Sequence, residues 1–417
     1  MKKCCKNIDI TDENQVYYYV EKCIYKHYRR YDFKKLLLQY GMTKLNYKIC
    51  YDSCDKSLLV NPIRNITVEV CKQIRNRHLR IPYKPIITER ADTTTFKLRL
   101  IGKECPIQQV FDYIAVYSCE ELFNKKLVHA QASSIEGRGQ VYGKNLIVKY
   151  TKSNNRAMRY AKKHNLRYTD KCKYFVKLDA KKCYPNARWE YLKPIFERYC
   201  DNEDIIWLWE ELMKTYHVNV TKLDGSIEPY NGFMIGALPS MWGIQLMISF
   251  IYRYAMSLRY FKKSKSFRTF NHSVIFMDDT LFIGSNRTQM LKCIKSIIQF
   301  SRDRLGIEIK DNFEIREFSK FPIDMMGYVI HKNGKVTLRN RNFIHTTRLA
   351  KRYMSNRMIT LPFARRVVSY KGFYNNSDMD NTVKKFKLNE LFEACQLFIR
   401  NYELRKKGIL NENNVCN

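Results

Sequence analysis

The chain has 417 residues, with 75 Lys and Arg against 40 Asp and Glu, so its formal net charge at pH 7 is +35. A compact protein of this charge repels itself, so an anionic partner is expected. The longest apolar run, residues 241–251, contains Gln245 and is too short to span a bilayer, so we expect no membrane partner.

The 14 cysteines are scattered along the chain, and no secretory apolar segment follows the amino terminus. Reduced thiols in the cytosol are the simplest account of this usage. We therefore expect a cytoplasmic protein.

Residues 1–85 have the pattern of basic helices, and six tyrosines occur early in them: Tyr17, Tyr18, Tyr19, Tyr25, Tyr28 and Tyr31. Aromatic side chains between Lys and Arg can stack on bases, but tyrosines at helical spacing more often pack against other helices. We favour packing. Pro82 and Pro85 end this pattern ahead of predicted strands.

Lys97 and Arg99 alternate on a predicted strand, so they share a face. That face suits the β and γ phosphates of a nucleotide, which become more charged during phosphoryl transfer, and a guanidinium can bind phosphate through two hydrogen bonds. Arg138, between Gly137 and Gly139, could approach a nucleic-acid backbone. An ordinary glycine turn is the alternative.

Two predicted strands end in carboxylates. A short apolar strand brings Asp179 to its carboxyl end, before a turn at Pro185. Residues 274–283 are two apolar runs around Asp278 and Asp279, which predicts a hairpin with both acids at its tight turn. Such acids are costly unless a cation meets them, and Mg²⁺ prefers oxygen ligands. A two-metal phosphoryl-transfer site needs carboxylates that converge in this way, with the metals about 3.5–4 Å apart.

Later segments are mostly helical in pattern. Residues 190–213 are predicted as helical, residues 233–254 as a glycine-containing loop that leads into a long buried helix, and residues 388–398 as an apolar helix. Residues 144–173, 253–268 and 339–372 are strongly basic. We expect these three runs to bind phosphate backbone with an affinity that falls steeply with salt, although charge runs are also typical of solvated helix faces.

Seven segments, in order over residues 97–328, resemble the motifs of reverse transcriptases. Leu178-Asp179 with Tyr184, and Phe276-Met277-Asp278-Asp279, resemble the two catalytic motifs, although Phe276 replaces the usual Tyr of Tyr-x-Asp-Asp. The other five resemble the fingers segment that grips the triphosphate (97–101), a basic template loop (133–139), motif B (232–240), motif D (305–310) and the primer-grip turn (325–328).

Details of motif B are similar to the prokaryotic branch of the family, and most of all to the reverse transcriptases of diversity-generating retroelements. Aliphatic Ile235 precedes Gly236, and Ser240 follows four residues after that glycine. Met241 departs from this group, which usually has Gln there. Reverse transcriptases of retrons and of phage defence are alternatives, as is a catalytically silent RNA-binding relative, against which the three intact acids argue.

The resemblance implies an α+β right-hand polymerase with fingers, a palm whose antiparallel sheet is backed by helices, and a helical thumb. The implied regions are an N-terminal basic helical extension (1–85), fingers (86–173), a catalytic palm (174–333), and a thumb with a C-terminal tail (334–417). It also implies the cytoplasm of a bacterial or phage-infected cell.

The implied activity is that of an RNA-directed DNA polymerase, a nucleotidyltransferase. Its catalytic acids would be Asp179, Asp278 and Asp279, which with the carbonyl of Ala180 would hold two Mg²⁺ ions, or Mn²⁺ in their place. The residues implied to bind dNTP are Lys97, Arg99, Tyr184, Ile235, Gly236 and Lys310. Those implied to bind template or primer are Arg138, Met326, Gly327, Arg348, Arg352, Arg365 and Arg366. The implied partners are an RNA template, a DNA or RNA primer, dNTPs and a small basic accessory protein.

Two side chains imply specificity, and a third implies a step of the reaction. A bulky ring at Tyr184 leaves no space for a 2′-hydroxyl, so deoxynucleotides would be selected sterically. Ile235 offers no hydrogen bonds to the template, where the commoner Gln would, so low fidelity is expected. Lys310 is expected near the leaving pyrophosphate as a proton donor; an ordinary exposed lysine after a strand is the alternative.

Overall fold

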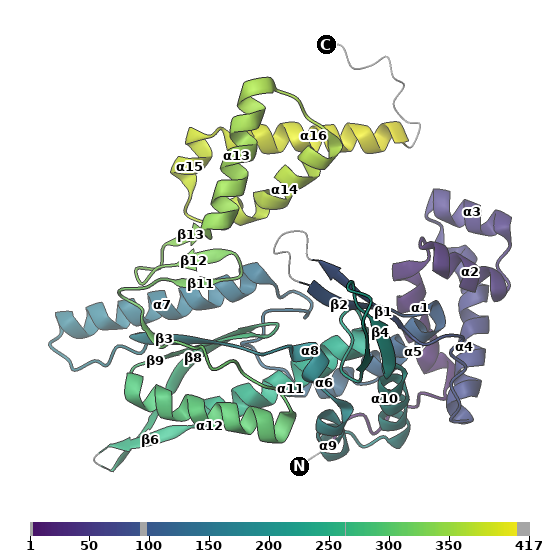
Figure 1. Ribbon diagram of the computed structural model, residues 1–417, viewed down its shortest axis with the longest axis horizontal. Helices are drawn as coiled ribbons and strands as arrows, with labels where there is room; N and C mark the ends of the chain where they lie inside the picture. The colour runs from purple at the N-terminus through teal and green to yellow at the C-terminus, as the bar shows by residue number, and fades with distance from the viewer. Residues whose placement is uncertain (1–2, 92–97, 263, 407–417) are drawn as a thin grey trace. The chain divides into compact units, whose positions relative to one another are not determined.

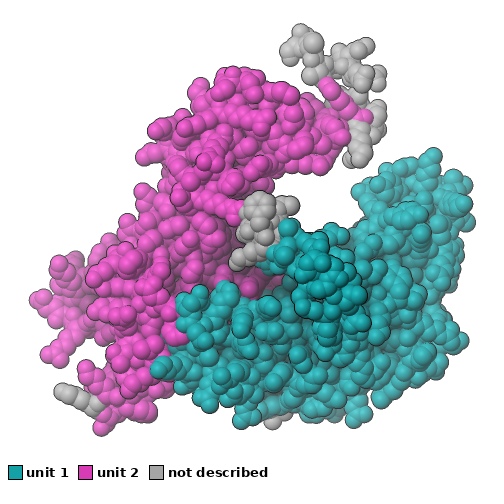
Figure 2. Space-filling model, viewed as in Figure 1, with its two compact units in different colours: residues 1–129, 178–257, 293–312 teal, residues 130–177, 258–292, 313–417 magenta. Residues whose placement is uncertain are grey.

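The computed structural model describes residues 3–91, 98–262 and 264–406 (Figure 1). The chain divides into two compact units (Figure 2). Unit 1 comprises residues 1–129, 178–257 and 293–312, and unit 2 comprises residues 130–177, 258–292 and 313–417. Each unit is therefore built from three separated stretches of sequence. No helix in the described ranges is long and apolar enough to cross a membrane.

Unit 1 begins with basic helices, as predicted. These are α1 (Glu13–His27), α2 (Tyr31–Gln39), α3 (Lys44–Ser53), the 3₁₀ turn η1 (Lys56–Leu59) and α4 (Val60–Arg75). The buried stripe of α1 includes Val16, Val20 and Ile24, one helical turn apart. Of the early tyrosines, Tyr19 and Tyr28 are buried and pack as expected, whereas Tyr18 and Tyr31 are exposed.

A four-stranded sheet follows in unit 1, with the order β2-β1-β4-β5. Its strands are β1 (Ile86–Ala91), β2 (Leu98–Lys103), β4 (Val218–Thr221) and β5 (Ile227–Tyr230). β1 pairs with β2, and β4 with β5, in antiparallel fashion, while β1 and β4 pair in parallel. The accompanying helices are α5 (Pro106–Tyr117), α6 (Glu120–Lys126), α8 (Cys183–Asn186) and α11 (Leu238–Ser257). The predicted buried helix is thus α11, much of whose surface is buried.

The helical character predicted for residues 190–213 is confirmed, although the structure divides the segment into two helices. α9 covers Trp189–Tyr199 and α10 covers Glu203–Thr215. Asn202 caps α10, since its side chain accepts a hydrogen bond from the Ile205 N–H at 3.0 Å. The break between the helices is also held by the amino-terminal segment, because the Asp201 N–H donates to the Cys4 carbonyl at 2.8 Å.

Unit 2 contains most of a second sheet, with the order β10-β3-β9-β8. Its strands are β3 (Tyr174–Asp179), β8 (Phe270–Phe276), β9 (Asp279–Gly284) and β10 (Arg316–Glu317). The 24-residue helix α7 (Gln140–Lys163) precedes β3, and α12 (Arg287–Leu305) follows β9. The chain passes from unit 2 into unit 1 within β3, at Leu178, and again within α12.

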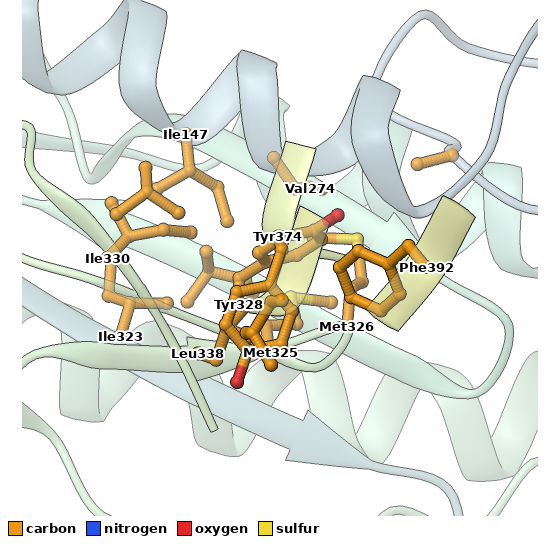
Figure 3. Packing of buried hydrophobic residues seen from close by; sticks show 14 of the residues in the cluster. Ile147, Val274, Ile323, Met325, Met326, Tyr328, Ile330, Leu338, Tyr374 and Phe392 are labelled. Carbon is orange, nitrogen blue, oxygen red and sulfur yellow. The ribbon is translucent and has the colours of Figure 1, made fainter. Parts of the chain in front are cut away.

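The rest of unit 2 is a small sheet and a helical end. The sheet has the order β11-β12-β13, from β11 (Ile323–Met325), β12 (Tyr328–Ile330) and β13 (Val336–Leu338). The helices are α13 (Asn340–Asn356), α14 (Leu361–Asn375), α15 (Asp380–Lys385) and α16 (Leu388–Lys406), so the apolar helix predicted near the carboxyl end is present. One core joins these parts: Ile147 of α7, Val274 of β8, Tyr328 of β12, Tyr374 of α14 and Phe392 of α16 belong to the same buried cluster (Figure 3).

Candidate active site

The predicted acidic hairpin is present in unit 2, but only one of the two acids lies in its turn. β8 and β9 are antiparallel and Phe276 pairs with Asp279, so Met277 and Asp278 form a two-residue turn. Met277 has a φ of +55°, the left-handed backbone that such short turns require at the first central residue. Asp278 is exposed and Asp279 is half-buried at the start of β9. The turn therefore presents the Asp278 carboxylate to solvent and places Asp279 at the first position of β9.

The turn is also held by Ser133, the first residue of the predicted template loop. The Ser133 hydroxyl accepts a hydrogen bond from the Met277 N–H at 2.7 Å. The segment before it runs beside β8, since the Ala132 N–H donates to the Ile275 carbonyl and the Ile275 N–H to the Ala130 carbonyl, each at 2.8 Å. The predicted template loop is thus hydrogen-bonded to the acidic turn within unit 2.

Asp179 ends β3 and lies in unit 1, half-buried. The Lys310 ammonium donates to its Oδ2 at 2.5 Å, and the Lys310 N–H donates to its carbonyl at 2.9 Å. A bridge between Ala180 and Ile309 continues this pairing. The segment that resembles motif D therefore runs alongside the segment that follows Asp179, and a lysine meets the carboxylate's charge.

Gly236 lies against the end of strand β2 in unit 1. The Gly102 N–H donates to the Ile235 carbonyl at 2.9 Å, and Ile101 and Ile235 form a parallel bridge. Gly236 has a φ of +110°, and a Cβ there would lie 3.0 Å from the Gly102 carbonyl oxygen, so both conformation and space favour glycine. These contacts hold Ile235 and Gly236 beside the end of β2, two to three residues after Arg99 in that strand.

Arg99 lies directly opposite Arg90 in the β1–β2 pair. Like charges across a strand pair are destabilising, so this pair of guanidinium groups suits a polyanionic ligand. Lys97 lies outside the described residues.

Tyr184 is held next to the same loop. It is half-buried in α8, and its carbonyl accepts a hydrogen bond from the Phe233 N–H at 2.9 Å. A Cβ on Gly232 would lie 2.2 Å from the Pro185 carbonyl oxygen, so only glycine allows this approach. Unit 1 therefore gathers the segments of Arg99, Tyr184 and Ile235, three of the residues predicted to contact the nucleotide.

Met326 and Gly327 form the predicted tight turn, in unit 2. Met325 pairs with Tyr328, and the two residues between them have φ values of +57° and +83°, as a two-residue turn of the I′ type requires. A Cβ on Gly143 of α7 would lie 2.4 Å from the Met326 sulfur, so α7 packs closely on the turn.

The arginines predicted to bind template or primer are also in unit 2. Arg348 and Arg352 of α13, and Arg365 and Arg366 of α14, are exposed. The Arg138 guanidinium lies 5.6 Å from the Tyr142 ring centroid and donates to the Gln131 carbonyl at 3.3 Å. Its backbone immediately precedes Gly139, the N-cap of α7.

The predicted site residues thus divide between the units. The described nucleotide-contact residues and Asp179 lie in unit 1, whereas Asp278, Asp279 and the template- and primer-contact residues lie in unit 2. Among the described residues, no group of three or more His, Cys, Asp or Glu is arranged so that it could hold a metal ion. The carboxylate and carbonyl oxygens at the two strand ends are the donor atoms that Mg²⁺ prefers. One of these carboxylates, that of Asp179, forms an ion pair with the ammonium group of Lys310.

Sequence reasoning also missed a buried polar network in unit 1. The Tyr216 hydroxyl donates to Glu104 Oε1 at 3.1 Å, and the Met234 N–H donates to the Ser240 hydroxyl at 2.9 Å. Glu104 follows directly after β2, and Met234 directly precedes Ile235. Burial raises the pKa of Glu104 to about 7. These contacts support the strand and the loop behind the predicted nucleotide residues.

Residues 124–328 match a family model described as "Reverse transcriptase (RNA-dependent DNA polymerase)". These residues form a reverse transcriptase domain. The domain includes the acidic turn, Asp179, the Ile235–Gly236 loop and the Met326–Gly327 turn. The family assignment agrees with the antiparallel sheet and the helices of the structure. The predicted α+β right-hand polymerase fold is confirmed.

Solved telomerase structures are similar to this chain. Telomerase from Candida albicans in complex with a TWJ fragment of telomeric RNA matches with 12% identity and a TM-score of 0.40, over 78% of this chain and 59% of that one. Apo telomerase from Candida tropicalis matches with 13% identity and a TM-score of 0.42, over 84% of this chain and 71% of that one. This chain thus spans less than two thirds of the first structure's length. No curated protein sequence matches.

Proposed function

We propose that the reverse transcriptase domain copies RNA into DNA, with Asp179, Asp278 and Asp279 as its catalytic acids. The observation that carries the proposal is the two-residue turn that exposes Asp278 within residues matching the family model. Strand β3, which ends in Asp179, is the neighbour of β9 in the same sheet. Carboxylates at the end of β3, in the β8–β9 turn and at the start of β9 are the kind of ligand that a two-metal site uses.

The acids and the Ala180 carbonyl would hold two Mg²⁺ ions, which when bound would activate the primer 3′-hydroxyl and stabilise the charge on the triphosphate. Arg99, with Lys97, would bind the β and γ phosphates. Lys310 neutralises Asp179 in the free protein. In the reaction its Nζ would give a proton to the pyrophosphate as the bond between the α-phosphorus and its bridging oxygen breaks.

The test of the reaction class is extension of a DNA primer on an RNA template with dNTPs and Mg²⁺. Asp278→Asn should abolish extension, because the amide cannot supply a negatively charged ligand, and should leave the protein folded because the side chain is exposed. Asp52→Asn, which removes an exposed carboxyl on α3, is the matched control and should extend normally. Full activity of Asp278→Asn would refute the assignment of the acids, and an inactive parent protein would refute the polymerase function.

We further infer that synthesis is error-prone, as in diversity-generating retroelements. Ile235 supports this, because an aliphatic side chain offers the template no hydrogen bond and its backbone is fixed by Gly102. Sequencing of products should show fewer substitutions opposite template adenines for Ile235→Gln than for the parent, with Ile235→Leu as the apolar control. Equal error rates at adenine for all three proteins would rule out this role. DNA made without the supplied template would instead favour a defence-type enzyme.

A further inference from the structure

Strands β6 (Arg259–Lys262) and β7 (Lys265–Arg268) form a separate two-stranded hairpin in unit 2. β6 lies at the lower left of Figure 1, and among the described residues the two strands form a sheet of their own. Seven of the eight strand residues are exposed. Isolated two-stranded hairpins are marginally stable in water at best, so this one gains little from the core of its own unit.

The register of the hairpin places like charges directly opposite each other. Arg259 pairs with Arg268, and Lys262 pairs with Lys265. Cross-strand pairs of like charge are destabilising. None of the four cations forms an ion pair within the described part of the chain, and the sequence has no Asp or Glu from residue 229 to residue 277. The hairpin therefore carries a concentrated positive charge that its own surroundings do not neutralise.

Aromatic rings lie between these cations on both faces. Tyr260 and Phe267 pair across the strands and stack with centroids 5.5 Å apart. Because side chains alternate along a strand, Lys262 and Lys265 share their face. Phe261 lies on the opposite face, with Arg259 and Arg268, and is 75% exposed. Each face thus offers a ring beside two cations.

We propose that the β6–β7 hairpin is an arm that binds single-stranded nucleic acid. Its cations would contact the phosphates, and the uncovered ring of Phe261 would stack on an unpaired base. Cationic grooves with aromatic platforms are how sequence-tolerant single-strand binders work. A bilayer would favour an apolar face opposite a cationic one, whereas here both faces are mixed. The proposal deepens the proposed function, because the natural strand would be the RNA template, but it requires no catalysis.

The experiment measures binding alone, in the Asp278→Asn background without Mg²⁺ or dNTPs. Fluorescence anisotropy would follow a labelled 20-nucleotide oligouridine and a 20-base-pair RNA–DNA duplex over a range of salt concentrations. The test protein carries Gln in place of Arg259, Lys262, Lys265 and Arg268. The charge-matched control carries Gln in place of Lys6, Lys44, Lys48 and Lys72, which are exposed lysines of unit 1.

The test protein should bind oligouridine at least tenfold more weakly than the control. Its slope of log affinity against log salt should fall by about 2–3, since each lost phosphate contact removes about 0.7. Its melting temperature should stay equal or rise, because like-charge repulsion is relieved. Phe261→Ala should weaken oligouridine binding about fivefold or more and leave duplex binding unchanged.

Two outcomes would overturn the proposal: equal losses in the test and control proteins, or equal losses for duplex and single strand with no effect of Phe261→Ala. The result is independent of the polymerase assay. If the parent protein fails to extend primers but the arm variants lose oligouridine binding, the single-strand-binding role of the arm is supported and the proposed polymerase function is refuted.

Discussion

Asp112 is a carboxyl group in the interior of unit 1, only 1% exposed, and neither of its oxygens meets a hydrogen-bond donor in the described part of the chain. An unpaired buried carboxylate is very costly. Two neighbouring carboxyls avoid that cost when one is protonated and donates to the other. Burial, and next the charge of Glu104, raise the pKa of Asp112 well above its ordinary range, and burial raises that of Glu104 to about 7. Arg30, Cys105 and Tyr216 are the other ionisable groups that act on the pair.

This pair makes stability depend on pH. Both folded-state pKa values lie above the unfolded ones, so the folded protein binds more protons. Stability from the pair is therefore complete below pH 4 and is lost as the pH rises, through about 7 for Glu104. Asp112→Asn removes one of these protons, so the fall in unfolding free energy between pH 5 and 8 should become shallower by up to about 1.4 kcal/mol per pH unit. Urea denaturation across that range measures it. A slope as steep as that of the parent, or of Asp52→Asn, would show that Asp112 is ionised in the fold.

Tyr184 should exclude ribonucleotides by the volume of its ring. Its backbone contact with Phe233 does not involve the side chain, so Tyr184→Ala should keep the loop in place. We expect the kcat/KM ratio of rNTP to dNTP to rise at least tenfold, because the space for a 2′-hydroxyl is opened. Tyr184→Phe keeps the ring and should behave as the parent. An unchanged ratio in Tyr184→Ala would mean that another group selects the sugar.

The contrast between Asp278 and Asp112 shows which residues a sequence reveals. Asp278 stands between two apolar runs within ten residues, so a local pattern predicted its turn. The effect of Asp112 on stability depends on Glu104 and Tyr216. The hydrogen bond between Glu104 and Tyr216 joins residues that are 112 positions apart. Ser133 lies 144 positions from the turn that it fastens. Contacts made only after folding leave no local pattern of charge or hydrophobicity.

At the scale of elements, the β11–β12 hairpin depends on Gly327. Its φ is +83°, and a Cβ would lie 2.5 Å from the Phe373 ring. Gly137 has a similar φ of +71° but has nothing within 4 Å of a Cβ, so it is the matched control for backbone strain. Gly137→Ala should cost about 1 kcal/mol, and Gly327→Ala at least about 2 kcal/mol, because overpacking adds to the strain. Urea denaturation measures both. Equal costs would show that Phe373 moves aside freely.

Element types were easier to predict than element ends and partners. The hairpins at Asp278 and Met326, the helix α11 and the amino-terminal helices all carry local periodicity or turn residues. The break between α9 and α10 was missed because apolar residues continue on both sides of it, although Asn202 followed by two acids is a helix start. The mixed order β2-β1-β4-β5 was out of reach, since it joins strands more than 100 residues apart.

At the scale of the whole molecule, the net charge of +35 opposes the compact state and favours a polyanion. Most described ion pairs are on the surface, where each contributes little. Added salt should therefore act in opposite directions on stability and on binding. Between 20 and 200 mM NaCl the melting temperature should rise, because repulsion among the unneutralised cations is screened over about 10 Å or less, while affinity for RNA should fall at least tenfold through counterion release. Differential scanning fluorimetry and anisotropy in the same buffers measure the two. A melting temperature that falls with salt would mean that the native ion pairs stabilise the fold more than its excess charge destabilises it.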